Sequence, residues 1–326
     1  MAPTDLDPDE LIQGITAGNR RMIAKTMTLI ESNLPAHQAV AQGVMDAVLP
    51  DTGKSVRLGI TGVPGVGKST FIESLGVSLA DEGHRVAVLA VDPTSRRSGG
   101  SILGDKTRME KLSVHANAFI RPSPAGATLG GVAARTREIM LVCEAAGFDV
   151  ILVETVGVGQ SETAVAAMVD FFLVLAIAGA GDELQGIKKG VLELADAIAI
   201  NKADGDNLDR VGQTRQDLET AMHLVASETP TWHTPVLACS SVIKGGTREV
   251  WDTVLDHRQK FMETGEFDQR RRAQSLEWMW TLVDEGLKQR FRENEQIKQQ
   301  IPVVSQQVEN EKISPSAAAK ALLSYL

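Results

Sequence analysis

The sequence is short of the residues on which several protein classes depend. It holds two cysteines, Cys143 and Cys239, which are too few for a disulfide framework or a four-thiolate zinc site. Its longest apolar run, residues 171–178, is too short to cross a bilayer. Aromatic residues make up only 4% of the chain, so we expect an aliphatic core. The amino-terminal residues have neither an apolar run nor an arginine cluster, and so predict no secretory signal or transit peptide.

Positive charge is also in short supply. The chain has 33 Lys and Arg residues against 42 Asp and Glu residues, which gives a formal net charge of −9. A general nucleic-acid binder needs a basic surface that neutralises phosphates, so we expect no nucleic-acid partner. Scarce cysteine is typical of a reducing compartment. We therefore expect a soluble, cytoplasmic protein without a membrane partner, and the length of 326 residues favours about two domains.

Short apolar runs recur through the middle of the chain, and each is followed by a polar loop and a helical stretch. The runs lie at residues 56–61, 85–91, 150–154, 171–177, 197–201 and 236–239, with a weaker one at 118–120. Strands that are apolar on both faces and alternate with helices are typical of a sheet covered on both sides. The pattern predicts an α/β fold with a mostly parallel central sheet flanked by helices.

Both ends of the chain have helical rather than strand spacing. Residues 9–48 predict two helices separated by Pro35. A long amphipathic helix is predicted over residues 266–300 and ended by Pro302. Ser314, followed by a proline, predicts the start of a last helix.

These patterns divide the chain into three predicted parts. They are an amino-terminal helical extension (1–50), a nucleotide-binding domain (51–262) and a carboxy-terminal helical arm (263–326). An apolar stripe runs along the arm from Leu276 to Phe291. The stripe favours burial against a second copy of the chain, which predicts a homodimer, over packing on its own core.

A phosphate-binding loop is the strongest motif in the sequence. It fits the pattern G-x-x-x-x-G-K-[ST] between a predicted strand and a predicted helix, which is the context the motif requires. Glycines let backbone N–H groups turn toward phosphates, the lysine adds a positive charge, and the serine hydroxyl can bind Mg²⁺. The predicted nucleotide-binding residues here are Gly62, Val63, Pro64, Gly65, Val66, Gly67, Lys68, Ser69 and Thr70.

Two further segments predict which base is bound. Asn201, Lys202 and Asp204 fit N-K-x-D at the end of a predicted strand. A carboxylate can accept hydrogen bonds from N1–H and the 2-amino group of guanine, whereas adenine leaves it unpaired, so we expect GTP and GDP as ligands. The next predicted strand leads into Ser240, Ser241 and Val242, where a backbone N–H could read guanine O6, although a simple helix cap explains this loop equally well.

The chemistry is expected at a segment that resembles D-x-x-G. Glu154 stands in place of the aspartate that holds Mg²⁺, and Gly157 is expected to donate its N–H to the γ-phosphate. With Lys68 these are the predicted catalytic residues. The predicted metal ligands are Ser69, Asp92, Asp105 and Glu154, and the choice among the three acids stays open. Val158 occupies the place of a water-positioning glutamine, which predicts slow intrinsic hydrolysis.

A glycine-rich charged segment, residues 178–190, follows another predicted strand. One hypothesis is that it senses the nucleotide or a partner, and an ordinary strand-to-helix connection is an equal alternative. The residues predicted to take part are Gly179, Asp182, Glu183, Gln185, Lys188 and Lys189.

The order GVPGVGKST, VDPTS, ETVGVGQSE, AGAGDELQGIKKG and NKAD resembles the MeaB/ArgK family of P-loop GTPases. The resemblance implies a homodimeric GTPase that acts as a chaperone of the adenosylcobalamin-dependent methylmalonyl-CoA mutase. It would gate cofactor loading and protect the mutase from inactivation, with hydrolysis stimulated by that partner. It also implies switch segments at about residues 92–108, 154–161 and 179–189.

Two other functions stay open. A metallochaperone-type GTPase would need clustered His or Cys, whereas the six histidines and two cysteines are scattered along the chain. An ArgK-like kinase acting on a transport protein would need an acceptor-binding insertion, and the sequence offers no candidate beyond the loops already named. Such a kinase would also be expected to prefer ATP, whereas Asp204 predicts a guanine nucleotide.

Overall fold

The computed structural model describes residues 7–91, 109–122, 129–155, 161–179, 189–223 and 231–326. Asp92, Asp105, Gly157, Asp182, Glu183, Gln185 and Lys188 lie outside these ranges. The chain divides into two compact units, Met1–Arg272 and Ala273–Leu326, and each is considered by itself.

The first unit is built on a seven-stranded sheet in which every neighbouring pair of strands is parallel. The spatial order is β3-β2-β4-β1-β5-β6-β7, so β1 lies in the centre. The strands are β1 (Val56–Gly62), β2 (Val86–Val91), β3 (Ala118–Arg121), β4 (Val150–Thr155), β5 (Phe171–Ile177), β6 (Ala197–Asn201) and β7 (Val236–Ala238). All seven predicted runs form strands, and the α/β prediction is confirmed.

Helices cover both faces of this sheet. Those that follow the first strand are α4 (Lys68–Asp81), α6 (Glu110–Val114), α7 (Leu129–Ala145), α8 (Ser161–Ala166), α10 (Lys189–Leu192), α11 (Leu208–His223) and α12 (Arg248–Thr264). Residues from α4, α6 and α12 share one core with one face of the sheet, while α7, α8, α10 and α11 contribute to the core on the other face. Both cores are mainly aliphatic, as the low aromatic content predicts.

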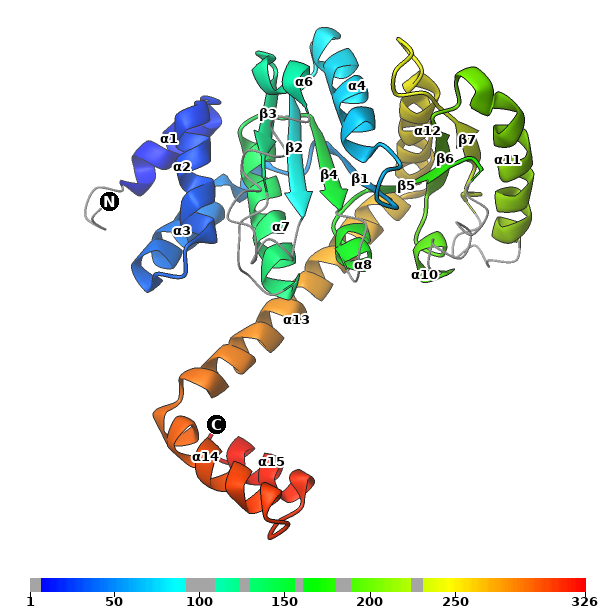
Figure 1. Ribbon diagram of the computed structural model, residues 1–326. Helices are drawn as coiled ribbons and strands as arrows, with labels where there is room; N and C mark the ends of the chain where they lie inside the picture. Colours follow the sequence, from blue (N-terminus) through cyan, green and yellow to red (C-terminus); the bar gives the residue numbers. More distant parts are fainter. Residues whose placement is uncertain (1–6, 92–108, 123–128, 156–160, 180–188, 224–230) are drawn as a thin grey trace. The chain divides into compact units, whose positions relative to one another are not determined.

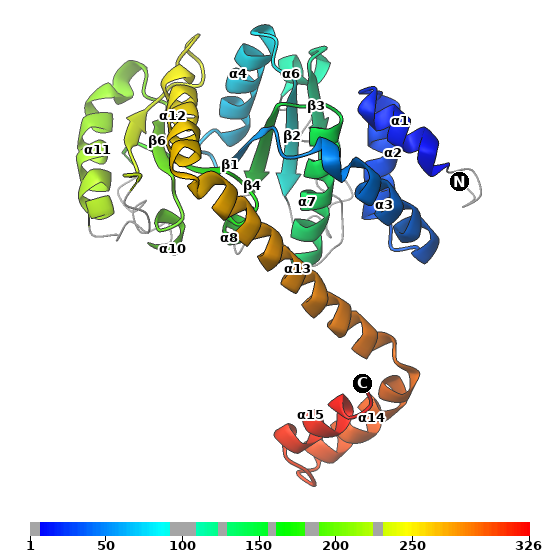
Figure 2. The same cartoon turned by 180° about the vertical axis from the view of Figure 1, so that it is seen from behind.

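Three helices, rather than the two predicted, form the amino-terminal extension. They are α1 (Pro8–Thr16), α2 (Arg20–Glu31) and α3 (Pro35–Val48), followed by a short 3-10 turn, η2 (Leu49–Asp51). The unpredicted break arises because Asn19 caps α2, accepting hydrogen bonds from the N–H groups of Arg21 and Met22. The helices pack on one another and on α7. Figures 1 and 2 show them beside the β3 end of the sheet, with α11 beside the β7 end.

The second unit contains most of α13 (Glu266–Glu293), with α14 (Glu295–Glu309) and α15 (Pro315–Leu323). The prediction of one helix that Pro302 ends is wrong. Helix α13 ends at Glu293, Asn294 caps α14, and Pro302 lies inside α14. The N-cap bonds of Asn294 start the new helix, and packing of α14 against α15 offsets the hydrogen bond that proline cannot make. The predicted start of α15 is confirmed, because Ser314 accepts from the N–H of Ala317 at 3.2 Å.

Candidate functional site

The predicted phosphate loop connects the central strand β1 to α4 at the carboxyl edge of the sheet (Figure 1). The backbone leaves no room for side chains at two of its glycines. A Cβ atom on Gly62 would lie 2.5 Å from the carbonyl oxygen of Leu175, and one on Gly67 would lie 2.8 Å from Nδ2 of Asn201. Gly67 also has a φ of 97°, which favours glycine, at the N-cap of α4. The loop is therefore shaped by its glycines, as the motif predicts.

Lys68 is the first residue of α4, and its side chain turns back over the loop. Its Nζ atom donates to the carbonyl oxygens of Gly62 at 2.7 Å and Val63 at 3.3 Å. The residue is buried although it carries a charge. The lysine thereby places positive charge against the backbone that is expected to surround the phosphates.

Two of the four predicted metal ligands come together. Oγ of Ser69 donates to Oε1 of Glu154 at 3.0 Å. Glu154 is brought there by β4, in which it lies beside Ile60 of β1. A hydroxyl and a carboxylate are the oxygen donors that suit Mg²⁺, so this pair fits that ion. The other two predicted ligands, Asp92 and Asp105, fall outside the described ranges, as does Gly157.

The predicted guanine-reading loop begins where β6 ends and is bonded directly to the phosphate loop. Nδ2 of Asn201 donates to the carbonyl oxygen of Val66 at 2.9 Å, and Nζ of Lys202 donates to that of Gly65 at 2.9 Å. Lys202 has a positive φ of 59°, which is uncommon for a residue with a side chain. Asn201 is 1% exposed. Two loops predicted separately from the sequence therefore form one structure.

The loop after β7 completes this assembly. Ser241 donates from Oγ to Oδ1 of Asn201 at 2.8 Å, and the hydroxyl of Ser240 donates to the carboxylate of Asp204. The latter bond holds the side chain that is expected to read guanine, on the residue directly before the 3-10 turn η4 (Gly205–Asn207). Val242, the third predicted residue of this loop, is 74% exposed. The structure thus brings together Asn201, Lys202, Asp204, Ser240 and Ser241, whereas no hydrogen bond joins the exposed Val242 to them within the described part of the chain.

The predicted sensing segment is described only at its ends. Gly179 follows β5 and lies against the side chain of Arg210 in α11, where an added Cβ would be 2.9 Å from Cδ. Lys189 begins α10, and the remaining four predicted residues fall within 180–188, outside the described ranges. Sequence reasoning missed Arg210, since no spacing rule connects it with Gly179. It also missed a buried hydroxyl pair, in which Oγ1 of Thr155 donates to Oγ1 of Thr61 at 2.7 Å.

Buried ion pairs lie at the opposite edge of the sheet, where β1 and β5 begin. Arg57 donates from Nε and Nη2 to the two carboxylate oxygens of Glu144, both at 2.8 Å, and Arg271 donates in the same forked manner to Asp170 at 2.8 Å. Burial opposes ionisation of Glu144, but hydrogen bonds and the charge of Arg57 outweigh it and lower the pKa of that carboxyl. The first pair joins β1 to α7, and the second joins Arg271 to the residue before β5, so we read both as structural. Neither pair contains a predicted site residue.

Other titratable groups are perturbed by burial. Burial raises the pKa of Glu138 to about 7, against the opposing charge of Arg135. Burial also raises the pKa of the Cys239 thiol to about 12 and that of Cys143 above its usual range. Neither cysteine is therefore a thiolate at neutral pH. Among the residues placed by the structure, no group of three or more His, Cys, Asp or Glu side chains could hold a metal ion.

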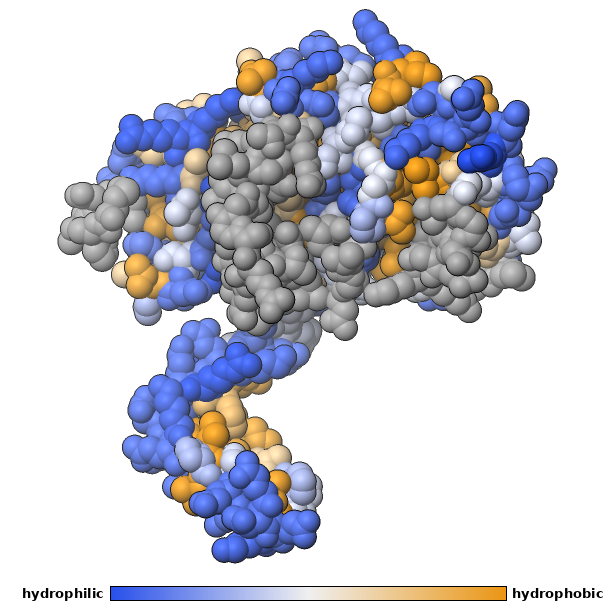
Figure 3. Space-filling model, in the orientation of Figure 1, coloured by the Kyte–Doolittle hydropathy of each residue, from blue (hydrophilic) through white to orange (hydrophobic). Residues whose placement is uncertain are grey.

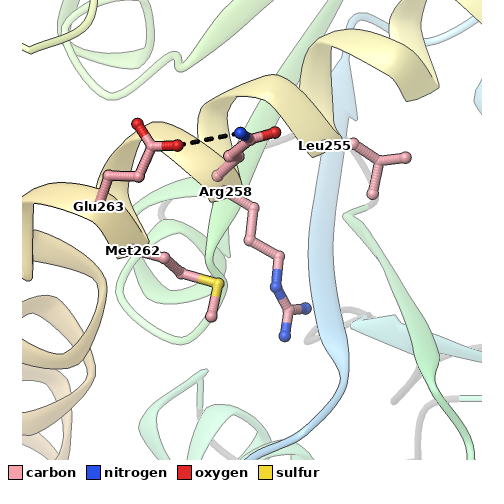
Figure 4. Close-up of a pocket in the computed structure, with 5 residues that line it drawn as sticks. Leu255, Arg258, Met262 and Glu263 are labelled. Atoms are coloured by element: carbon pink, nitrogen blue, oxygen red, sulfur yellow. Dashed lines mark hydrogen bonds between the residues drawn. The ribbon is translucent and has the colours of Figure 1, made fainter.

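A shallow pocket on α12 lies apart from these loops. Figure 4 shows side chains of that helix lining it. Nε2 of Gln259 donates to Oε1 of Glu263 at 2.9 Å. Its lining residues are Leu255, Arg258, Gln259, Met262 and Glu263. None of them is a predicted site residue, so the pocket is not the nucleotide site.

A central strand that leads into a phosphate loop, an acid on the neighbouring strand and a guanine-type N-K-x-D loop define a P-loop GTPase. Comparison with known proteins agrees. A family model described as "Methylmalonyl Co-A mutase-associated GTPase MeaB" matches residues 23–296. The chain belongs to this MeaB family of GTPases.

Relatives of known name are similar along nearly their whole length. A protein of Mycobacterium tuberculosis (strain ATCC 25618 / H37Rv), described as a probable GTPase, is 51% identical over 97% of this chain and 94% of its own. The GTPase ArgK of Escherichia coli (strain K12) is 46% identical, covering 97% of this chain and 96% of its own. A crystal structure titled "LAO/AO transport system kinase" aligns with a TM-score of 0.77 and 40% identity, covering 98% of this chain and 97% of that one.

Proposed function

We propose that this GTPase binds GTP and GDP with Mg²⁺ and hydrolyses GTP slowly. The observation that carries the proposal is the joining of the phosphate loop to the N-K-x-D loop by Asn201 and Lys202. Such a connection ties recognition of the base to recognition of the phosphates. Asp204, held by Ser240, then selects guanine over adenine.

Each predicted side chain has a separate task in this proposal. Lys68 neutralises phosphate charge, while Ser69 and Glu154 hold Mg²⁺, with Asp92 and Asp105 as further candidate ligands. Magnesium would supply charge compensation at the phosphates. Gly157 is proposed to donate its N–H to the γ-phosphate. The absence of a glutamine directly after Gly157 is the reason for expecting slow hydrolysis.

The partner is proposed to be the adenosylcobalamin-dependent methylmalonyl-CoA mutase. The description of the MeaB family, which connects its GTPases with that mutase, supports this choice. In this role the nucleotide state would gate cofactor loading and protect the mutase from inactivation, and the mutase would stimulate hydrolysis. The segment 178–190 is the proposed sensor of nucleotide or partner.

The second unit supports the proposal of a homodimer. Its helix α13 exposes large apolar side chains, among them Leu276 at 59%, Trp280 at 62% and Leu287 at 49%. Figure 3 shows apolar side chains at the surface of this unit beside polar ones. Apolar surface that a single chain leaves in water is stabilised by burial against a second copy. Replacing Trp280 and Leu287 by glutamate should yield monomers in light scattering, whereas an unchanged dimer would contradict this assignment.

The cellular setting is proposed to be the cytoplasm, without a nucleic-acid or membrane partner. The net charge of −9 argues against phosphate backbones as ligands. No helix within the described ranges is long and apolar enough to pass through a membrane.

A kinase acting on a transport protein is the second candidate, because the structure with a TM-score of 0.77 carries a kinase title. The guanine-type loop argues for GTP rather than ATP as the nucleotide in either case. The metallochaperone alternative has no cluster of metal ligands to support it among the residues that the structure places.

The decisive experiment measures phosphate release from GTP with the purified chain alone and with the mutase, using ATP as the control nucleotide. A slow rate with GTP, raised by the mutase and absent with ATP, supports the proposal. A rate that the mutase leaves unchanged would contradict the partner. Transfer of the γ-phosphate to a protein acceptor would instead establish the kinase.

A further inference from the structure

A buried hydroxyl pair joins β1 to β4 at the edge of the sheet where both strands end. Oγ1 of Thr155 donates to Oγ1 of Thr61 at 2.7 Å. Thr155 is fully buried and Thr61 is 1% exposed. Because a buried hydroxyl that loses its partner is costly, the bond is a specific link between the two strands.

The link lies one residue beyond the paired backbone of these strands. Their register ends at Ile60 beside Glu154, and the hydroxyl pair comes next along each strand. Gly62, with which the phosphate loop begins, directly follows Thr61, and the proposed magnesium ligand Glu154 directly precedes Thr155. The pair therefore connects the start of the phosphate loop to the strand that carries the metal-binding acid.

The hydroxyl pair and the proposed metal ligands lie on opposite faces of the sheet. Successive side chains along a strand alternate between its faces. Glu154 accepts from Oγ of Ser69 in α4, so Thr155 lies on the other face. There α8 packs closely on β1, since a Cβ atom on Gly59 would lie 2.9 Å from Cγ1 of Val165. An effect of the pair on a bound ion would therefore pass through the backbone at Glu154.

We propose that this hydroxyl pair positions Glu154 beside Ser69, so that the two side chains can bind one Mg²⁺ ion. Ser69 follows the phosphate loop, which begins at the end of β1, whereas Glu154 belongs to β4, so the two ligands depend on different strands. Ligands that are already in place bind an ion without the cost of ordering them. Thr61 and Thr155 are thus positioning residues. The inference rests on the proposed function, since it needs Mg²⁺ at these two ligands.

The test measures the Mg²⁺ concentration that half-saturates binding of a slowly hydrolysed GTP analogue, and the affinity for the same analogue in EDTA. Thr155→Val replaces the hydroxyl by a methyl group of similar size. Its Mg²⁺ requirement should rise by roughly three- to tenfold, the effect of one neutral hydrogen bond. The affinity in EDTA should stay unchanged, because the phosphate loop and the base-reading loop do not include β4. Thr155→Ser keeps the hydroxyl and should need as much Mg²⁺ as the wild-type protein.

Two further variants separate positioning from stability. Thr61→Val/Thr155→Val removes both hydroxyls and leaves no unsatisfied partner, so the double variant should keep a urea midpoint close to that of the wild-type protein. Its Mg²⁺ requirement should still be raised. Thr26→Val is the matched control, because it removes a buried hydroxyl that donates to the carbonyl oxygen of Met22 within α2. This control should leave the Mg²⁺ requirement unchanged.

A wild-type Mg²⁺ requirement in the double variant would overturn the inference, since binding of the ion would then not depend on the pair. Equal weakening with Mg²⁺ and in EDTA would also overturn it, because that pattern reports general damage to the nucleotide site. If the wild-type protein bound no guanine nucleotide, or bound it without any dependence on Mg²⁺, the proposed function would fail and this inference with it. A Mg²⁺ dependence that the wild-type protein and all variants share would overturn the inference alone.

Discussion

Replacing Asn201 by alanine should remove the hydrogen bonds that join the N-K-x-D loop to the phosphate loop and to the loop after β7. The side chain is 1% exposed, donates to the carbonyl of Val66 at 2.9 Å and accepts from Ser241 at 2.8 Å. Its loss leaves partners on two other loops without their bonds. Each unsatisfied buried group costs about 1–3 kcal/mol, so losing bonds to two partners should lower the free energy of unfolding by roughly 2–6 kcal/mol. Because small domains have roughly 5–15 kcal/mol in total, the variant should still fold.

The assay combines urea unfolding with titration of GTP and GDP. Both affinities should fall by at least about tenfold, since even about 1.4 kcal/mol of lost preorganisation has that effect. Asn207→Ala is the matched control, because that side chain makes only a long 3.4 Å bond to Lys202. If Asn201→Ala and Asn207→Ala had equal unfolding free energies and equal affinities, the claim that Asn201 joins the loops would be refuted.

Three further predictions concern glycine geometry and buried carboxyls. Gly67→Ala should abolish measurable GTP binding in calorimetry while the fold persists by circular dichroism, because its Cβ would lie 2.8 Å from Asn201; normal binding would contradict the steric argument. Glu144 has a lowered folded-state pKa, so its contribution to stability is present above its unfolded pKa and is lost as pH falls through the folded one. Glu144→Gln should therefore lower the urea midpoint at pH 7, leaving Arg57 with a neutral partner, and the deficit should narrow toward pH 3. Glu138 has a pKa raised to about 7, so the wild-type protein should lose stability as pH rises from about 4.5 to 7. Glu138→Gln should be more stable than the wild-type protein at pH 8 and no more stable than it at pH 4. Equal unfolding curves of the two proteins at pH 8 would show that burial does not raise the pKa of this carboxyl.

The elements that the sequence predicts well are those specified by local chemistry. Residues 171–177 are apolar without interruption, and this pattern suffices to predict a strand buried on both faces, as β5 is. The signal for the phosphate loop is equally local, because its glycines and Lys68 all lie within residues 62–69. Ser314 with the proline after it predicted the start of α15 for the same reason.

The incorrect predictions arise where local signals compete or where packing decides. At Asn19 a capping signal competes with the helical spacing on either side of it, and the cap starts a new helix. At Pro302 the local signal predicts a helix end, but α14 continues through the proline and packs against α15. The bond between Thr61 and Thr155 could not be predicted at all, because it depends on β4 lying beside β1, which spacing along the chain does not reveal.

The arrangement of the strands explains why the two loops of the proposed nucleotide site are bonded to each other. Strand β1 lies between β4 and β5, so the phosphate loop at its end has the acid of β4 on one side. On its other side, beyond β5, β6 presents Asn201 and Lys202, whose side chains reach the loop's own carbonyl groups. A displacement of the base-reading loop must therefore break hydrogen bonds to the phosphate loop or carry that loop with it. In the proposed site, recognition of guanine and placement of the phosphates would therefore be a single structural event rather than two independent ones.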